Sequence, residues 1–128
     1  MGKYHDVHAA SLSDPEKFWL DAAQAVTWSR APERALDDGN PPFYRWFPDG
    51  RLNTCYNALD RHVAAGHGDR TALIYDSPVT GNAARYTYAE LLDEVARFAG
   101  VLRDLGVGKG DRVVIYMPMV PQTVVAML

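Results

Sequence analysis

The sequence predicts an α/β fold, in which a helical and extended N-terminal arm precedes the first strands and helix of a larger domain. Three observations lead to this class. Residues 88–105 carry apolar side chains at alternating spacings of four and three, which places them on one helix face. Residues 71–75 and 85–87 are β-prone and flank a turn-forming loop, as in a hairpin. The run from Arg112 to Met117 is apolar after its first residue, which is typical of a parallel-sheet strand covered on both faces.

The composition of the chain excludes several classes of protein. The chain has 128 residues, 48% of them hydrophobic, and a net charge of -3 without a Lys/Arg tract, so nucleic acid is not its expected partner. No run approaches the roughly 20 apolar residues of a membrane span. The N-terminal residues lack the apolar core of a signal peptide, and the single Cys55 excludes an internal disulfide framework. We therefore expect a soluble, cytoplasmic chain.

The arm is expected to begin with a helix. Ser13-Asp14-Pro15-Glu16 has the spacing of a capping box with Pro in the first turn, and apolar residues at helical spacing continue to about Val26. The stretch that ends near Asn40 is rich in turn formers and is predicted to be irregular. Pro41-Pro42 predicts extended backbone through Phe47, and Pro48-Asp49-Gly50 predicts a tight turn.

A second helix is predicted from Thr54 to about Ala64, capped by Asn53 and with Gly66 near its end. Its inward residues are expected to be Tyr56, Leu59 and Val63.

The hairpin and the long helix follow directly. The loop of the hairpin is expected at Asp76–Asn82. Thr87-Tyr88-Ala89-Glu90 is a second capping box, and it opens a helix that Gly106 ends. The inward face of this helix is predicted to consist of Leu91, Val95, Phe98, Leu102 and Leu105.

The last residues predict a further helix. Pro118 ends the apolar run, and Pro121 suits the first turn of a helix that stays apolar as far as Leu128. A terminal helix docked on a small, self-contained sheet is one interpretation. The absence of a C-cap or a polar tail favours the other, in which the chain is a truncated fragment of a larger protein.

No residue stands out as catalytic. The glycines of Gly106–Gly110 resemble a phosphate loop, but they follow a helix and precede a strand, which is the reverse of the order that presents helix N–H groups to phosphate. We interpret them as a helix end and a turn. The loop Ser77–Thr80 has hydroxyl groups but no Lys-bearing, Gly-rich cradle, so a hairpin tip is favoured.

Metal binding and acid–base catalysis are also not expected. Cys55 and His62 can share a helix face, but two ligands do not make a metal site. Asp60 and Arg61 are sequence neighbours of His62, so the three side chains point in different directions. The remaining histidines are His5, His8 and His67.

An aromatic group in the arm has two interpretations. Its members are Phe43, Tyr44, Trp46 and Phe47. They can form a stacking platform for a ligand, or they can anchor an extended segment to a domain surface. The second is the more common arrangement and is favoured.

Six segments together resemble the N-terminal part of a known family. They are D-P-E-K-F-W (14–19), W-F-P-D-G-R-L-N (46–53), Y-N-A-L-D-R-H (56–62), G-D-R-T-A-L-I-Y (68–75), Y-T-Y-A-E-L (86–91) and G-D-R-V-V-I-Y-M-P-M-V-P (110–121). The family is that of the AMP-forming short-chain acyl-CoA synthetases, the acetyl- and propionyl-CoA synthetases of the adenylate-forming superfamily. The sequence Y-D-S-P-V-T-G (75–81) is more similar to the propionate enzymes than to the acetate enzymes.

The resemblance implies an N-terminal extension over residues 1–66 and the incomplete start of an AMP-binding domain over residues 67–128. The parent enzyme is expected to be a propionate- or acetate-CoA ligase that uses ATP, Mg²⁺ and coenzyme A and forms an acyl-adenylate. The family's phosphate loop, acyl pocket and catalytic Lys would lie beyond Leu128. Hence we predict no catalytic, cofactor-binding or metal residue here, no cofactor bound by the fragment, and no activity of the fragment alone.

The expected partners are the remainder of the same enzyme and, in the parent, a small carboxylate substrate. A different class of function remains open. The chain can be a standalone or regulatory interaction module that uses the aromatic arm around Phe43–Phe47.

Overall fold

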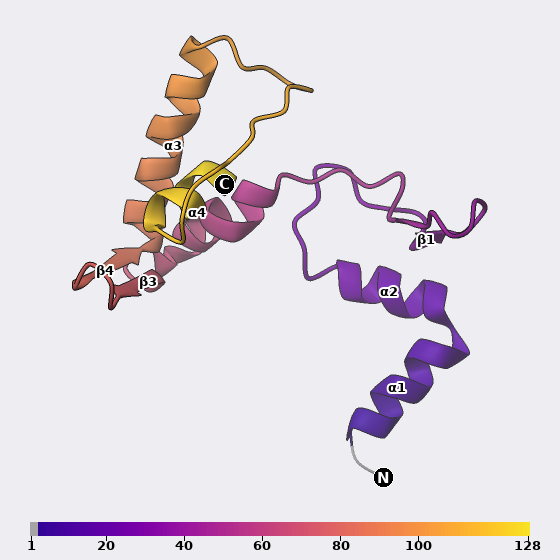
Figure 1. Cartoon of the computed structure of the whole chain (residues 1–128). Coiled ribbons are helices and arrows are strands. Elements are labelled where there is room, and N and C mark those ends of the chain that lie inside the picture. The colour runs from indigo at the N-terminus through magenta and orange to yellow at the C-terminus, as the bar shows by residue number, and fades with distance from the viewer. Residues whose placement is uncertain (1–2) are drawn as a thin grey trace. The chain divides into compact units, whose positions relative to one another are not determined.

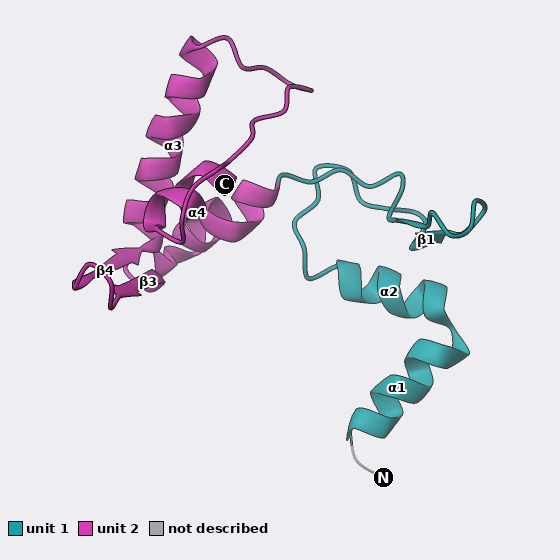
Figure 2. Cartoon of the chain, viewed as in Figure 1, with its two compact units in different colours: residues 1–53 teal, residues 54–128 magenta. Residues whose placement is uncertain are grey.

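The computed structural model describes residues 3–128, which form helices and short antiparallel strands (Figure 1). This mixed content confirms the predicted class. In chain order the elements are α1 (Lys3–Ser13), α2 (Pro15–Ala23), β1 (Leu36–Asp37), β2 (Arg45–Trp46), the π-helical turns η1 (Tyr56–Asp60) and η2 (Val63–His67), β3 (Thr71–Ser77), β4 (Asn82–Thr87), α3 (Tyr88–Asp104) and α4 (Pro121–Met127). The chain divides into two compact units, residues 1–53 and residues 54–128 (Figure 2).

The first helix boundary differs from the prediction by one residue. Asp14 caps α2, and its Oδ1 accepts a hydrogen bond from the backbone N–H of Lys17 at 3.0 Å. Pro15 then occupies the first helical position, which Pro prefers, and Ser13 ends the unpredicted helix α1. Because Asp14 and not Ser13 is the N-cap, Glu16 does not occupy the capping-box position. Its Oε1 instead accepts a hydrogen bond from the backbone N–H of Ala35 at 2.7 Å. The helix ends at Ala23, earlier than the predicted Val26.

The predicted extended stretch is mostly a turn. The backbone N–H of Phe43 donates to the carbonyl of Asn40 at 2.8 Å and closes a turn around the prolines. Only Arg45–Trp46 is a strand, paired antiparallel with Leu36–Asp37. Phe47 takes a left-handed backbone conformation (φ 48°), and the N–H of Gly50 donates to its carbonyl at 3.0 Å, which confirms the predicted tight turn.

Aromatic contacts and one carboxylate hold this unit together. Trp28 packs edge-on against Phe47 with ring centroids 5.5 Å apart, and its Nε1 donates to the carbonyl of Ala23 at 2.8 Å. Oδ2 of Asp49 accepts from the backbone N–H of Glu33 at 2.8 Å, and this bond is the main reason that the pKa of Asp49 lies below its usual value. The turn at 48–50 is therefore tied both to α2 and to the loop that follows it.

The second unit begins with the helix predicted from Thr54, and Gly66, with a left-handed φ of 80°, interrupts the helical backbone near the predicted end. Leu59 is fully buried as predicted, but Tyr56 is exposed, and Cys55 and Ala58 pack against the core instead. The reason is that η1 and η2 are π-helical. Each π turn holds more residues than an α turn, so a prediction from α-helical spacing assigns the inward face incorrectly.

The hairpin and α3 form the centre of the second unit. β3 and β4 pair antiparallel in the register Tyr75↔Ala84, and both are longer than predicted. The predicted capping box opens α3: the N–H of Glu90 donates to Oγ1 of Thr87 at 3.2 Å, and the N–H of Thr87 donates to Oε2 of Glu90 at 2.8 Å. The buried core cluster consists of Leu59, Leu91 and Val95. Leu105, predicted to face inward, is exposed at the end of the helix.

The predicted strand from Arg112 to Met117 is absent. In this chain the run carries no helix or strand, and Figure 1 shows it as a single trace between α3 and α4. Val114 and Tyr116 are exposed rather than covered. Among the described residues β3 and β4 pair with each other, and no other strand of the second unit is available to pair with the run. The predicted helix at Pro121 is present as α4.

Replacing Thr87 with Ala should lower the free energy of unfolding by about 1 kcal/mol, because the N-cap hydroxyl that accepts from Glu90 is lost. Chemical denaturation followed by circular dichroism measures the change. Thr87→Ser keeps the hydroxyl and should stay within about 0.5 kcal/mol of the wild type. An unfolding curve unchanged by Thr87→Ala would contradict this account of the helix start.

Replacing Gly50 with Ala should disrupt the first unit. A Cβ at this position would lie 2.7 Å from Cζ3 of Trp28, whose ring is held by its bond to Ala23. We expect a loss of about 1–3 kcal/mol and a shift in tryptophan emission, since overpacking forces the ring to move. Gly100→Ala is the matched control: no atom lies within 4 Å of its Cβ, and emission should not change. Wild-type emission and stability in Gly50→Ala would overturn the prediction.

Candidate functional site

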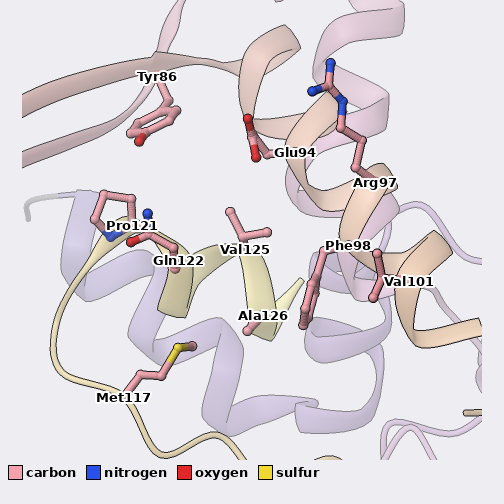
Figure 3. A pocket seen from close by; sticks show the side chains of 10 residues that line it. All are labelled: Tyr86, Glu94, Arg97, Phe98, Val101, Met117, Pro121, Gln122, Val125 and Ala126. Carbon is pink, nitrogen blue, oxygen red and sulfur yellow. The ribbon is translucent and has the colours of Figure 1, made fainter. Parts of the chain in front are cut away.

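A groove of about 460 Å³ lies between α3 and α4 in the second unit and is the candidate site (Figure 3). One wall is a single face of α3, because its four lining residues follow one another at spacings of three, one and three. They are Glu94, Arg97, Phe98 and Val101. The opposite wall comes from α4 and the residues on either side of the groove. They are Pro121, Gln122, Val125 and Ala126 of α4, with Tyr86 of β4 and Met117.

Local sequence signals set the position of both walls. The Thr87–Glu90 capping box determines where α3 starts and therefore which of its residues face α4. Pro121 occupies the first helical position of α4. The turn before it is fixed by Thr123, whose Oγ1 donates to the carbonyl of Pro118 at 2.6 Å. The cap thus sets which residues of α3 face the groove, and the Thr123 bond holds the turn that leads into α4.

The groove is built for an apolar occupant. Its charged members are Glu94 and Arg97, and Nη2 of Arg97 pairs with Oδ2 of Asp93 at 2.6 Å on the exposed side of the helix. The lining side chains include no Ser, Cys, His or Lys that could serve as a nucleophile next to a base. This arrangement can hold an aliphatic or aromatic group but offers no bond-making chemistry of its own.

The side chains considered for metal or acid–base chemistry do not meet in one place. Sγ of Cys55 lies 4.0 Å from Oδ2 of Asp60, and burial, followed by the charge of Asp60, raises the pKa of the thiol. The ring of His62 packs against that of Tyr88, with centroids 4.9 Å apart. Residues 3–128 contain no group of three or more His, Cys, Asp or Glu side chains placed to hold a metal ion.

The other three histidines, His5, His8 and His67, lie on α1 and η2. On α1, the ring of His8 stacks on that of Tyr4 with centroids 5.9 Å apart, and His5 meets the same ring edge-on. His67 closes η2. None of these residues lines the groove between α3 and α4.

The glycines at 106–110 end a helix and turn the chain. Gly106 has a left-handed φ of 88° and donates from its N–H to the carbonyl of Arg103, while Val107 donates to the carbonyl of Leu102. The N–H of Gly108 donates to Oδ2 of Asp111 at 2.7 Å, so it is already satisfied within the loop. At the hairpin tip, the Ser77 hydroxyl accepts from Thr80 at 3.4 Å.

Two members of the aromatic group of the arm make ring contacts and two do not pack in this way. Phe47 packs on Trp28, Trp46 meets Trp19 edge-on with centroids 5.4 Å apart, and the rings of Trp46 and Phe47 have centroids 6.0 Å apart. Phe43 and Tyr44 point to solvent, with 75% and 54% of their surface exposed. The four residues therefore do not form one stacking platform.

Sequence reasoning missed the groove, although a signal for its α3 wall existed. Glu94, Arg97 and Val101 share a helix face that adjoins the predicted core face, so they could have been grouped by helical spacing. Their contact with α4 could not have been predicted, because it depends on how the two helices pack.

In the described part of the chain, no helix has the length and apolar character needed to cross a membrane.

Comparison with known proteins gives two consecutive family matches. Residues 4–58 match the model of the acetyl-coenzyme A synthetase N-terminus, and residues 60–128 match that of AMP-binding enzymes.

Individual relatives agree with these matches. An uncharacterized protein of Pseudomonas aeruginosa is 57% identical over 98% of this chain and 20% of its own length. The mitochondrial acyl-CoA synthetase short-chain family member 3 of Rattus norvegicus is 51% identical over 99% of this chain and 19% of its own. The acetoacetyl-CoA synthetase structure from Streptomyces lividans superposes with a TM-score of 0.81 at 37% identity, over 99% of this chain and 20% of that one. The chain thus spans about a fifth of the length of these relatives.

The Cys55 thiol should titrate above 9.0, the ordinary value, because burial raises its pKa and Asp60 raises it further. The pH at which the alkylation rate by iodoacetamide reaches half its maximum reports this value. Asp60→Asn should lower the midpoint only in part, since burial is the larger cause, whereas Asp104→Asn should leave it unchanged. Full unfolding in denaturant should restore the ordinary midpoint, and a native midpoint at or below 9.0 would contradict the prediction.

Proposed function

The chain belongs to the family of AMP-binding enzymes, and on this premise we propose that the complete protein is an AMP-forming ligase for a short carboxylic acid. The observation that supports the proposal is the order of the two family matches. A synthetase N-terminus at residues 4–58 leads directly into an AMP-binding enzyme match at residues 60–128. Relatives that match nearly the whole chain carry the names of acyl-CoA synthetases.

Propionate is the acid that we propose, with acetate as the second choice. Support for propionate comes from residues 75–81, whose sequence, Y-D-S-P-V-T-G, is similar to that of the propionate enzymes. The names of the relatives are broader, since they refer to short-chain and to acetoacetyl substrates.

The proposed reaction has two steps. The carboxylate attacks the α-phosphate of ATP to give an acyl-adenylate and pyrophosphate, and the thiol of coenzyme A then displaces AMP to form the thioester. Charge gathers on the phosphates in the first step, so cationic side chains and Mg²⁺ are needed there. The described residues do not fit that need: Arg97 is the one cationic side chain that lines the groove and it pairs with Asp93, and the turn at Gly106–Gly110 follows the C-terminal end of α3. We therefore assign ATP, Mg²⁺ and coenzyme A to parts of the protein outside this chain.

The proposed role of this chain is structural. It supplies the hairpin, α3 and α4 as part of the AMP-binding domain, and its partner is the remainder of the same polypeptide. We infer a cytoplasmic location, supported by the single unpaired Cys55. The rat relative is named as mitochondrial, so cell fractionation is the measurement that separates the two compartments.

The second candidate function is that of a protein-interaction module. The observation that favours it is the exposure of Phe43 and Tyr44 in the arm. In that case the chain would bind its partner without becoming part of an enzyme. Ligase activity in a chimeric enzyme separates the two functions.

A chimera tests the proposal. The residues of the rat synthetase that match this chain are replaced by the 128 residues of this chain. We expect the chimera to form acyl-CoA and AMP from propionate, ATP and coenzyme A, because the substituted part is 51% identical over 99% of this chain. The 128-residue chain alone, and the rat enzyme with the same region deleted, should form neither product.

Two outcomes contradict the proposal. A chimera that melts cooperatively but makes no acyl-CoA would favour the interaction module. Thioester formation by the 128-residue chain alone would refute the purely structural role assigned to it.

A further inference from the structure

We propose that Asp38–Gly39 is a site of spontaneous backbone modification, at which the aspartate isomerises to isoaspartate through a cyclic succinimide. Asp49–Gly50, the same dipeptide in the same unit, is protected from this reaction by the fold. These are the two Asp-Gly pairs of the sequence. The inference does not depend on the proposed function, because it concerns only the chemistry of residues within the first unit.

The reaction needs a free aspartate side chain followed by an unshielded backbone nitrogen. The nitrogen of Gly39 attacks Cγ of Asp38, and the new N–C bond closes a five-membered ring while the carboxyl OH and the N–H proton leave as water. A water molecule then opens the ring at either carbonyl, which gives back aspartate or yields isoaspartate. Water is the only co-reactant. Glycine favours the attack because it has no Cβ to shield the nitrogen and its backbone turns freely.

The first observation is that the Asp38 side chain is unrestrained. Asp38 and Gly39 are both exposed. In the described part of the chain, the carboxylate of Asp38 takes part in no hydrogen bond and no ion pair. Its neighbour Asp37, by contrast, pairs with Arg45 at 2.6 Å. The side chain that has to bend back onto the backbone is therefore free to do so.

The second observation is that the attacking nitrogen is weakly held. The N–H of Gly39 donates to Oδ1 of Asp37 at 3.3 Å, which lies beyond the usual range of about 2.7–3.2 Å for such bonds. Both residues of the pair follow the end of β1, so their main chain is not held by strand pairing. The attack can therefore proceed without breaking a strong hydrogen bond or moving a buried group.

The third observation is that both reacting groups of the other pair are already bound. Oδ2 of Asp49 accepts from the N–H of Glu33 at 2.8 Å, and Oδ1 of the same side chain is buried. The N–H of Gly50 donates to the carbonyl of Phe47 at 3.0 Å. The bond from Glu33 also lowers the pKa of Asp49, which keeps the carboxyl ionised and makes it a poorer target for the nitrogen.

Isomerisation at Asp38 acts on the strand pair beside it. In isoaspartate the main chain runs through the side-chain Cβ, so it becomes longer by a carbon atom directly after Asp37. Asp37 is the last residue of β1 and pairs with Arg45 of β2, whose next residue, Trp46, meets Trp19 edge-on. We therefore expect tryptophan emission to shift as isoaspartate accumulates. Emission that stays constant during this accumulation would refute the effect on the strand pair.

Incubation of the 128-residue chain in heavy-oxygen water tests the proposal, because each opening of the succinimide incorporates a heavy oxygen atom. Trypsin cuts after Arg45, so mass spectrometry assigns the label to Asp38 or to Asp49 in separate peptides. We expect label at Asp38 to accumulate at least about 10-fold faster, since two hydrogen bonds must break before Asp49 reacts. In denaturant the two rates should converge. Equal rates in the native chain would overturn the proposal, as would an undiminished difference in denaturant.

Asp38→Glu is the matched control. It keeps the negative charge at an exposed position without a bonding partner, so the unfolding curve should not change. The longer side chain would have to close a six-membered ring, which forms far less readily. We expect the variant to lose the label in the peptide of residues 35–45 and to keep its tryptophan emission during incubation. Undiminished label in that peptide would show that another residue reacts and would refute the assignment to Asp38.

Discussion

The second unit depends on the start of one helix. The reciprocal hydrogen bonds between Thr87 and Glu90 fix the first residue of α3, and the first residue determines the direction of every side chain that follows. Leu91 and Val95 consequently meet Leu59 in the buried core. Phe98 lies on the adjoining face and forms part of the groove against α4. The cap therefore determines both which residues of α3 face the core and which residues of α3 line the groove.

Elements with a local signal were predictable from sequence, and those that depend on distant contacts were not. The hairpin and the capping box carry their own turn and cap residues, so both are present where expected. The predicted inward face of the helix after Asn53 was wrong because π-helical turns change the spacing of inward residues. No residue pattern in the sequence indicates such turns. The first helix boundary was wrong for a simpler reason, since Asp14 and Ser13 are both good caps and Pro15 selects the residue next to it.

The candidate site shows the same division. Each wall of the groove could be read from helical spacing, but its existence depends on α4 packing on α3 after a loop that bends at Gly106 and Gly110. The glycines were predicted to end a helix rather than to hold phosphate, and the bonds of Gly106 and Gly108 within the loop agree with that role. The lining of the groove is mostly apolar, and its charged members are Glu94 and Arg97.

The failed strand prediction is the most informative difference between sequence and structure. Residues 113–117 have the composition of a strand, and composition reports the environment for which a sequence was selected. A strand, however, is defined by hydrogen bonds to a neighbour, and a segment cannot supply these alone. Among the described residues, the run at 113–117 has no neighbouring strand, and Val114 and Tyr116 are exposed. Composition therefore predicted a strand here, and the lack of a neighbour among the described residues explains why none forms.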